Sequence, residues 1–249
     1  MTDNKKPEMQ KHIRCAPGDV ARYVLLPGDP ARAGRISATM DEATLIAENR
    51  EYVVYTGTTN GVAVSVCSTG IGGPSSAIVL DELTRVGADV FIRVGSAGGR
   101  REDIPIGTPI VITAAYRGDG SSKAYLPVEF PAVADLDVTN ALVNAARERG
   151  HDYRVGIGFT RDVYYIQDQP LNERLREAGV MAAEMEAATL FIAGIWRHVK
   201  VGCVVATDSN IWLPVQPTLV EKEELYFEGE KKVIAIALRA VQILAERGQ

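Results

Sequence analysis

Apolar residues along the chain follow two alternating patterns. Short, nearly continuous runs rich in valine and isoleucine predict strands whose two faces are both covered. Between several of them, apolar residues recur every three or four positions, as in Ile234, Leu238 and Val241, which predicts amphipathic helices. The predicted strands are 23–28, 62–68, 89–95, 108–113, 153–159 and 201–207. The predicted helices are 75–86, 137–149, 171–178, 183–196 and 231–247.

This alternation predicts an α/β fold, with a central twisted sheet that is mixed but mostly parallel and is flanked by helices. The 249 residues are enough for one large core, and no repeat, low-complexity segment or linker divides them. We therefore expect a single domain over residues 1–249. The stretch 211–230 contains two prolines and a cluster of glutamates, and we predict a loop or lid there.

Composition and charge argue against several classes of function. Hydrophobic residues make up 46% and charged residues 24%, which is ordinary for a soluble protein, and a net charge of -5 does not suggest a nucleic-acid-binding surface. Three scattered cysteines are typical of a reduced, cytoplasmic protein. No apolar run is long enough to span a membrane, and no His/Cys spacing is typical of a metal site. We expect a cytoplasmic protein whose partners do not include nucleic acid, membrane or metal.

Candidate binding residues follow the ends of the predicted strands, where ligands bind in open α/β sheets. The segment PGDPARAGR (27–35) makes a tight turn at Gly28 and then delivers Arg32. The segment STGIGGPSSAIVLDEL (68–83) leads a glycine-rich turn into a helix, with Pro74 near its first position, and such a helix start favours anions. Its spacing differs from the dinucleotide-binding fingerprint. On these segments alone, a solvated surface arginine and an ordinary turn are equally good interpretations.

The run FIRVGSAGG (91–99) places Arg93 inside an apolar strand, with Ser96 at the turn that follows. A buried guanidinium is costly unless it is paired. Two kinds of partner are open at this point. One is an internal Asp or Glu, and the other is a bound anion such as phosphate, whose oxygens match the guanidinium fork.

Three carboxylates are further candidates. Asp208, in VVATDSNIW (204–212), lies where a strand ends, so it is a general acid, a hydrogen-bond acceptor or a simple cap. Glu184 and Glu186, in AAEMEAATLF (182–191), fall in a predicted helix. Two positions on a helix correspond to about 200° of rotation, so we expect these two side chains to face different ways. A glutamate among alanines would suit the vicinal hydroxyls of a sugar.

Taken together, these segments resemble the nucleoside phosphorylase family that includes hexameric purine nucleoside phosphorylases and uridine phosphorylases. The resemblance implies a pentosyltransferase of nucleoside salvage, which reversibly converts a ribonucleoside and orthophosphate to a free base and ribose 1-phosphate without a cofactor. It also implies a homo-hexamer built as a trimer of dimers. The matching motifs, in order along nearly the whole chain, are PGDPARA, NREY (49–52), STGIGGPS, IRVGSAGG, AAEMEAATL and VVATDSN.

The resemblance also implies roles for individual residues. Arg50 and His12 would be donated by the neighbouring subunit of the dimer. Arg93 would hold phosphate close to C1′ in catalysis, and Asp208 would protonate purine N7. The full implied set is Gly28, Arg32, Arg50, Arg93 and Ser96 for phosphate, His12, Met185 and Glu186 for ribose, and Tyr164, Gln167, Glu184 and Asp208 for the base.

The identity of the base is the least determined feature. Typical uridine phosphorylases read uracil with a glutamine and an arginine two positions later, whereas here Gln167 is followed by Gln169. Asp208 suits a purine, although the sequence TDSN lacks the histidine and nearby arginine of the common bacterial purine motif. We therefore expect 6-oxopurine nucleosides such as inosine and guanosine, with uridine as the alternative and methylthioadenosine or another nucleoside as a further one. A nucleosidase that uses water and a non-catalytic nucleoside or anion sensor are more distant alternatives, and the phosphate-site arginines argue against both.

Overall fold

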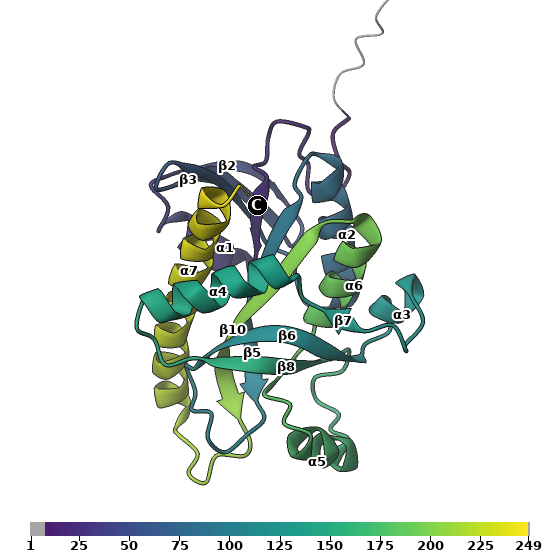
Figure 1. The fold of residues 1–249 in the computed structure, drawn as a ribbon, viewed down its shortest axis with the longest axis vertical. Coiled ribbons are helices and arrows are strands. Elements are labelled where there is room, and N and C mark those ends of the chain that lie inside the picture. The colour runs from purple at the N-terminus through teal and green to yellow at the C-terminus, as the bar shows by residue number, and fades with distance from the viewer. Residues whose placement is uncertain (1–7, 249) are drawn as a thin grey trace, which may run out of the picture.

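Strands and helices alternate along much of the computed structural model, which describes residues 8–248 (Figure 1). The strands are β1 (Tyr23–Leu26), β2 (Glu42–Asn49), β3 (Tyr52–Thr59), β4 (Val62–Cys67), β5 (Val90–Gly99), β6 (Pro109–Gly118), β7 (Ala132–Val133), β8 (Arg154–Arg161), β9 (Ala182–Glu184) and β10 (Lys200–Asn210). The helices are α1 (Pro30–Ser37), α2 (Gly73–Arg85), α3 (Ser121–Tyr125), α4 (Leu136–Glu148), α5 (Gln169–Glu177), α6 (Ala187–Arg197) and α7 (Leu219–Glu246).

All strands within residues 8–248 join in one sheet, in the order β10-β6-β8-β9-β5-β1-β4-β3-β2, with β7 beside β6. An additional pairing of β10 with β5 closes β5, β9, β8, β6 and β10 into a ring. The strands at the centre, β4, β1, β5 and β10, are parallel, whereas β2, β3 and β4 form an antiparallel meander. The sheet is therefore mixed, as predicted: β6, β8 and β9 form a second parallel group, which pairs antiparallel with β10, β5 and β7.

Helices cover both faces of the sheet, as the continuous apolar strands predict. Residues of α1, α4 and α7 share one buried core with the sheet, and residues of α2 and α6 share the other (Figure 1). Successive strand residues enter opposite cores, so Phe91 packs on the side of α2 and α6 and Ile92 on the side of α4 and α7. Gly194 lets α6 approach β10 closely, since a Cβ there would lie 2.4 Å from Cγ2 of Val201.

Several elements are absent from the sequence prediction, and most of them are short or exposed. These are α1, β2, β3, α3, β7 and β9. Most residues of β2 are exposed, so that strand lacks the apolar run by which the others were predicted. Helix α1 starts at Pro30 because Asp29 caps it, accepting hydrogen bonds from the backbone N–H groups of Ala31 and Arg32 at 2.9 and 3.1 Å.

Two predicted boundaries are wrong. The predicted helix 183–196 begins as the strand β9, and α6 itself starts only at Ala187. The predicted loop over 211–230 extends only to Thr218, where α7 begins. Thr218 and Glu221 form a capping box, in which the backbone N–H of Thr218 donates to Oε2 of Glu221 at 2.7 Å and the backbone N–H of Glu221 donates to Oγ1 of Thr218 at 3.3 Å.

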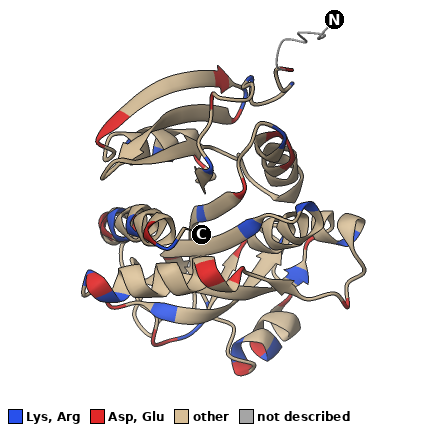
Figure 2. Ribbon diagram, turned by 45° about the horizontal axis from the view of Figure 1, so that its top comes forward, with Lys and Arg blue, Asp and Glu red and all other residues tan. Residues whose placement is uncertain are grey.

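Charged residues of both signs are interspersed along the helices in the ribbon view of Figure 2. This mixture accords with the modest net charge of -5. Within residues 8–248, none of the helices combines the length and the apolar composition that crossing a membrane requires.

The capping box predicts the effect of a substitution at Thr218. Thr218→Ala removes the side-chain acceptor at the start of α7, and we expect the free energy of unfolding to fall by about 1 kcal/mol. Thr218→Ser keeps the hydroxyl and should retain most of the stability. Chemical denaturation of both variants measures the difference, and equal stability of Thr218→Ala and the unsubstituted protein would contradict it.

Candidate active site

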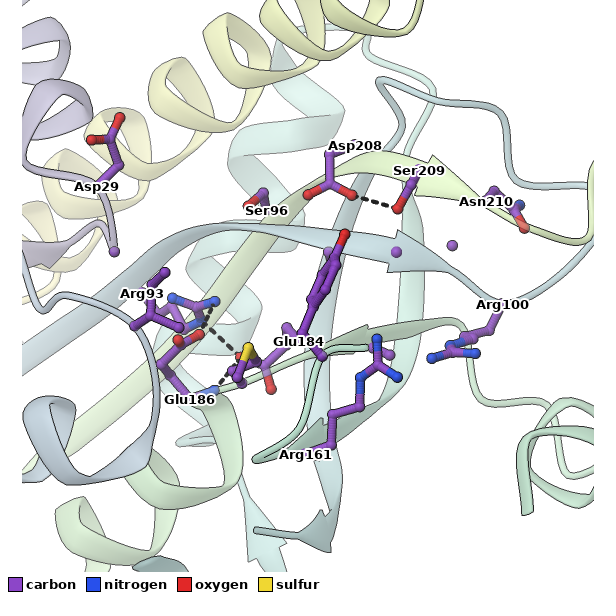
Figure 3. A pocket seen from close by; sticks show the side chains of 18 of the residues that line it. Asp29, Arg93, Ser96, Arg100, Arg161, Glu184, Glu186, Asp208, Ser209 and Asn210 are labelled. Atoms are coloured by element: carbon purple, nitrogen blue, oxygen red, sulfur yellow. Dashed lines mark hydrogen bonds and ion pairs between the residues drawn. The ribbon is translucent and has the colours of Figure 1, made fainter. Parts of the chain in front are cut away.

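A pocket of about 560 Å³ opens at the carboxyl ends of β1, β5, β8 and β10 (Figure 3). This volume lies in the range of small-molecule sites. Most of the residues that the sequence identifies as site candidates line this one pocket, and they reach it from five separate segments. They are Gly28, Arg32, Arg93, Ser96, Tyr164, Gln167, Glu184, Met185, Glu186 and Asp208.

Arg93 lies on the wall of the pocket between two buried glutamates (Figure 3). Arg93 is only 3% exposed. Nε donates to Oε2 of Glu184 at 2.9 Å, and Nη2 lies 2.5 Å from Oε2 of Glu186. Burial by itself lowers the pKa of Arg93, but attraction to Glu186 and Glu184 outweighs it and raises the pKa above its usual range. Internal carboxylates are thus one answer to the question of what pairs with this guanidinium.

Glu184 connects Arg93 to the start of α6. Its carboxylate accepts hydrogen bonds from the backbone N–H groups of Glu186 and Ala187, both at 2.8 Å, and from the hydroxyl of Thr160. Burial raises the pKa of this carboxyl despite the attraction of Arg93. Through these contacts Glu184 holds Arg93 and the start of α6 together. Its expected contact with the base stays a prediction, and Glu184 does line the pocket. The expectation that Glu184 and Glu186 face different ways is wrong, because Glu184 ends a strand and both carboxylates reach the same arginine.

Glu186 joins the glycine-rich turn before α2 to Arg93. Oε1 accepts a hydrogen bond from the backbone N–H of Gly72 at 2.6 Å, while Oε2 faces Arg93. Gly72 has φ +93°, a conformation that favours glycine, and the turn depends on it. A carboxylate has about four acceptor positions, so Glu186 has acceptor capacity left for a ligand in the pocket.

Arg32 is buried and is held by α7, although it lies far from that helix in the sequence. Nε donates to Oε2 of Glu230 at 2.7 Å, Nη1 donates to the carbonyl of Val94 at 3.1 Å, and Nη2 contacts the hydroxyl of Tyr226. Burial raises the pKa of Glu230, but hydrogen bonds from Arg35 and Arg32 outweigh it, so the net pKa is lowered. The interpretation of Arg32 as a solvated surface residue is therefore wrong, and any phosphate must share it with Glu230.

Asp208 reaches the pocket through an irregularity in β10. Thr207 pairs with Ala97 and Ser209 pairs with Gly98, so Asp208 is the extra residue of a β-bulge. A bulge redirects a side chain at the edge of a site. The carboxylate points into the pocket and accepts a hydrogen bond from the Ser209 hydroxyl at 2.7 Å (Figure 3). Because β10 continues to Asn210, Asp208 lies inside a strand and does not act as a cap at its end.

Two arginines that the sequence did not identify line the pocket beside Tyr164 and Gln167. Arg161 ends β8 and donates from Nη1 to Oε1 of Gln167 at 2.9 Å, with its guanidinium carbon 5.5 Å from the centre of the Tyr164 ring. Arg100 directly follows β5 and donates from Nη1 to Oδ1 of Asn172 at 3.3 Å. The available signal was their position a few residues beyond a predicted strand, Arg100 after 89–95 and Arg161 after 153–159, and both observed strands extend further than predicted.

His12 and Arg50 are absent from the pocket lining of their own chain. His12 lies on a neighbouring part of the surface, where Nδ1 is 2.6 Å from Oε1 of Glu82 and its carbonyl accepts a hydrogen bond from Asn49 at 2.7 Å. Arg50, which follows Asn49, is exposed and has φ +55°. Their donation to the pocket of a second subunit stays a prediction.

Known proteins resemble the chain over nearly its full length. The sequence model of the phosphorylase superfamily matches residues 22–242. The uridine phosphorylase of Thermococcus kodakarensis is 47% identical over 96% of this chain and 87% of its own, and the guanosine phosphorylase of Halorubrum lacusprofundi is 36% identical over 94% and 99%. The crystal structure of uridine phosphorylase from Vibrio fischeri superimposes with a TM-score of 0.87 at 31% identity and covers 96% of this chain and 99% of that one.

The packing around Arg93 predicts that Gly95 cannot be replaced without loss. A Cβ at Gly95 would lie 2.7 Å from Cζ of Arg93, which its two carboxylate partners hold in place. We expect Gly95→Ala to lower the free energy of unfolding by about 1–3 kcal/mol in chemical denaturation.

Gly34→Ala is the matched control, because its Cβ would lie 3.7 Å from the Tyr55 hydroxyl inside α1. This variant should be neutral, or more stable by about 0.5–1 kcal/mol. Equal stability of the two variants would show that the space around Arg93 is not tightly filled.

Proposed function

The chain belongs to the phosphorylase superfamily, and we propose on this premise that it is a nucleoside phosphorylase acting on uridine. In the proposed reaction an oxygen of orthophosphate forms a bond to C1′ of the ribose. The C1′–N1 bond breaks, and its electron pair leaves with the base. The products are ribose 1-phosphate and uracil, the latter after it takes a proton, and the reaction is reversible.

Uridine takes the place of the 6-oxopurine nucleosides that we expected from the sequence. The observation that carries this choice is the 47% identity to the Thermococcus kodakarensis uridine phosphorylase along almost the whole of both chains. The structural similarity to the Vibrio fischeri uridine phosphorylase supports the same choice. The presence of Asp208, which suits protonation of a purine, therefore does not decide the choice of base.

Phosphate binding is proposed at the part of the pocket formed by Gly28, Arg32, Arg93 and Ser96. A guanidinium has five N–H donors, and the contacts of Arg93 with its two glutamates use only some of them. The remaining donors are available to phosphate oxygens. Holding the phosphate dianion next to C1′ accelerates the reaction by proximity and by electrostatic stabilisation.

Ribose binding is proposed beside Glu186 and Met185, which lie next to Arg93 in the pocket. The free acceptor positions of Glu186 suit the 2′- and 3′-hydroxyls of the sugar. The sugar becomes positively charged as the glycosidic bond breaks, and a buried carboxylate nearby stabilises that charge.

Completion of the site by a second copy of the chain is part of the proposal. His12 would reach the 5′-hydroxyl, and Arg50 would reach the phosphate of the neighbouring subunit, in a hexamer assembled from such dimers. Two observations support this. Arg50 is exposed, and Asn49, its neighbour in the sequence, donates a hydrogen bond to the carbonyl of His12, so both residues lie on one surface that a second subunit could contact.

Phosphate dependence distinguishes the proposed enzyme from its alternatives. The purified protein is incubated with uridine, guanosine or inosine, with and without phosphate, and the released base is measured by chromatography. We expect uracil release only with phosphate, and kcat/KM for uridine at least about tenfold above that for the purine nucleosides. Release without phosphate would instead identify a nucleosidase, and binding of uridine without turnover would identify a sensor.

Guanosine phosphorolysis is the second candidate, and the position of Asp208 in the pocket favours it together with the Halorubrum lacusprofundi relative. If Asp208 protonates purine N7, Asp208→Asn should lower kcat for guanosine by about 100-fold or more, while uridine, which has no N7, should lose much less. Asp103→Asn, at an exposed aspartate, is the control. An equal loss on both nucleosides would contradict an acid role specific to purines.

A further inference from the structure

The part of the pocket away from Arg93 contains two guanidiniums, those of Arg100 and Arg161, and neither forms an ion pair with a carboxylate of residues 8–248 (Figure 3). Arg161 contacts the amide of Gln167, and Arg100 contacts the amide of Asn172. Within residues 8–248, no Asp or Glu forms an ion pair with either arginine. The two guanidiniums lie close enough for Arg161 to act electrostatically on Arg100.

This arrangement of two like charges is electrostatically unfavourable. Arg100 is only 6% exposed, and its Nε has no hydrogen-bond partner among the described residues. Burial, and in addition repulsion from Arg161, lowers the pKa of Arg100 to about 10. Two like charges that share a partly buried wall without a counterion are costly, and an unsatisfied buried donor adds to that cost.

The other buried arginines of the chain have more hydrogen-bond acceptors around them. Arg93 is bound to two glutamates, and Arg32 is bound to Glu230. Arg117 pairs with no carboxylate of residues 8–248, but it donates to four backbone carbonyls, those of Ser122, Leu126, Pro127 and Phe130. Arg100 therefore differs from them in lacking acceptors rather than in being buried.

The wall that Arg100 and Arg161 form presents mainly donors. A guanidinium has no acceptor, so the oxygen of the Gln167 amide must face Arg161, and its nitrogen donates to the carbonyl of Tyr164 at 2.9 Å. Aromatic rings hold the two charges in place, since the guanidinium carbon of Arg100 lies 5.9 Å from the centre of the Phe159 ring and Arg161 lies over Tyr164. Such a wall suits carbonyl oxygens and is a poor match for an exocyclic amino group.

We propose that Arg100 and Arg161 bind the exocyclic oxygens of the leaving base and determine the selectivity for uracil over cytosine. When the C1′–N1 bond breaks, its electron pair passes to N1 and is shared with O2 and O4, where the guanidiniums stabilise it. The proton that restores neutral uracil comes from water. This inference rests on the proposed phosphorolysis of uridine, and it supplies a guanidinium for the base where Gln169 occupies the position of the usual arginine.

Substitution by methionine tests the proposal, because it removes the donors and keeps much of the side-chain volume. In Arg100→Met and in Arg161→Met we expect kcat/KM for uridine to fall by about 10- to 100-fold, as for loss of a charged hydrogen bond, with the KM for phosphate nearly unchanged. The ratio of kcat/KM for uridine to kcat/KM for cytidine should also fall in both variants.

The neighbouring arginines provide matched controls. Arg101 follows Arg100 in the sequence and pairs with Asp103, and Arg154 lies on the same strand as Arg161 and pairs with Asp152. Arg101→Met and Arg154→Met should keep kcat/KM for uridine within about twofold. The stability of Arg100→Met should equal or exceed that of the unsubstituted protein, because an uncompensated buried charge is removed.

A second nucleoside separates an effect on the leaving base from a general structural defect. The fluorine of 5-fluorouridine withdraws electrons and stabilises the departing anion without the protein's help. The two pocket variants should therefore lose less activity on 5-fluorouridine than on uridine.

The outcomes also separate this inference from the proposed function. If the unsubstituted protein does not release uracil from uridine with phosphate, the proposed function fails. If it does, but the pocket variants retain kcat/KM within about twofold, or lose equally on uridine and 5-fluorouridine, only the role of Arg100 and Arg161 fails.

Discussion

A buried guanidinium bound between two carboxylates holds the pocket together. Arg93 comes from the central strand β5, Glu184 ends β9, and Glu186 lies at the start of α6. Glu186 also binds the backbone of Gly72, so the turn before α2 belongs to the same cluster. Removing one partner of such a cluster leaves an uncompensated buried charge, which is strongly destabilising. The positions of several strand ends and helix starts therefore depend on one set of ion pairs.

The charges of the pocket are unevenly distributed, and this matters for the proposed chemistry. Around Arg93, two carboxylates face one guanidinium, whereas Arg100 and Arg161 form no ion pair with a carboxylate of the described residues. In the proposed reaction the sugar gains positive charge while the base gains negative charge. A site whose fixed charges oppose those that develop stabilises the transition state more than the substrate. The distribution of charge thus agrees with cleavage of a glycosidic bond in one orientation of the nucleoside, with the ribose beside the glutamates and the base beside Arg100 and Arg161.

Features that a local sequence pattern determines, such as buried strands and turns at strand ends, were predictable from the sequence. The buried strands follow from continuous apolar runs, and the pocket follows from motifs at their ends. The exposed strand β2 lacks such a run, and the first half of α7 is charged, so only the capping box at Thr218 indicates where α7 begins. Glu184 and Glu186 were assigned to a helix because alanines favour helices, whereas pairing with β5 and β8 makes the first a strand residue.

The partners of buried arginines were not predictable, because they come from distant segments. Arg32 and Glu230 are separated by 198 positions, and no local pattern joins them. A buried arginine in a sequence therefore does not by itself indicate a ligand, since the fold can supply carboxylates, as for Arg93, or backbone carbonyls, as for Arg117. It becomes a candidate for ligand binding where the folded chain leaves one of its donors without a protein acceptor and the residue lines a pocket. Arg100 meets this condition, which is why the structure directs attention to a residue that the motifs did not include.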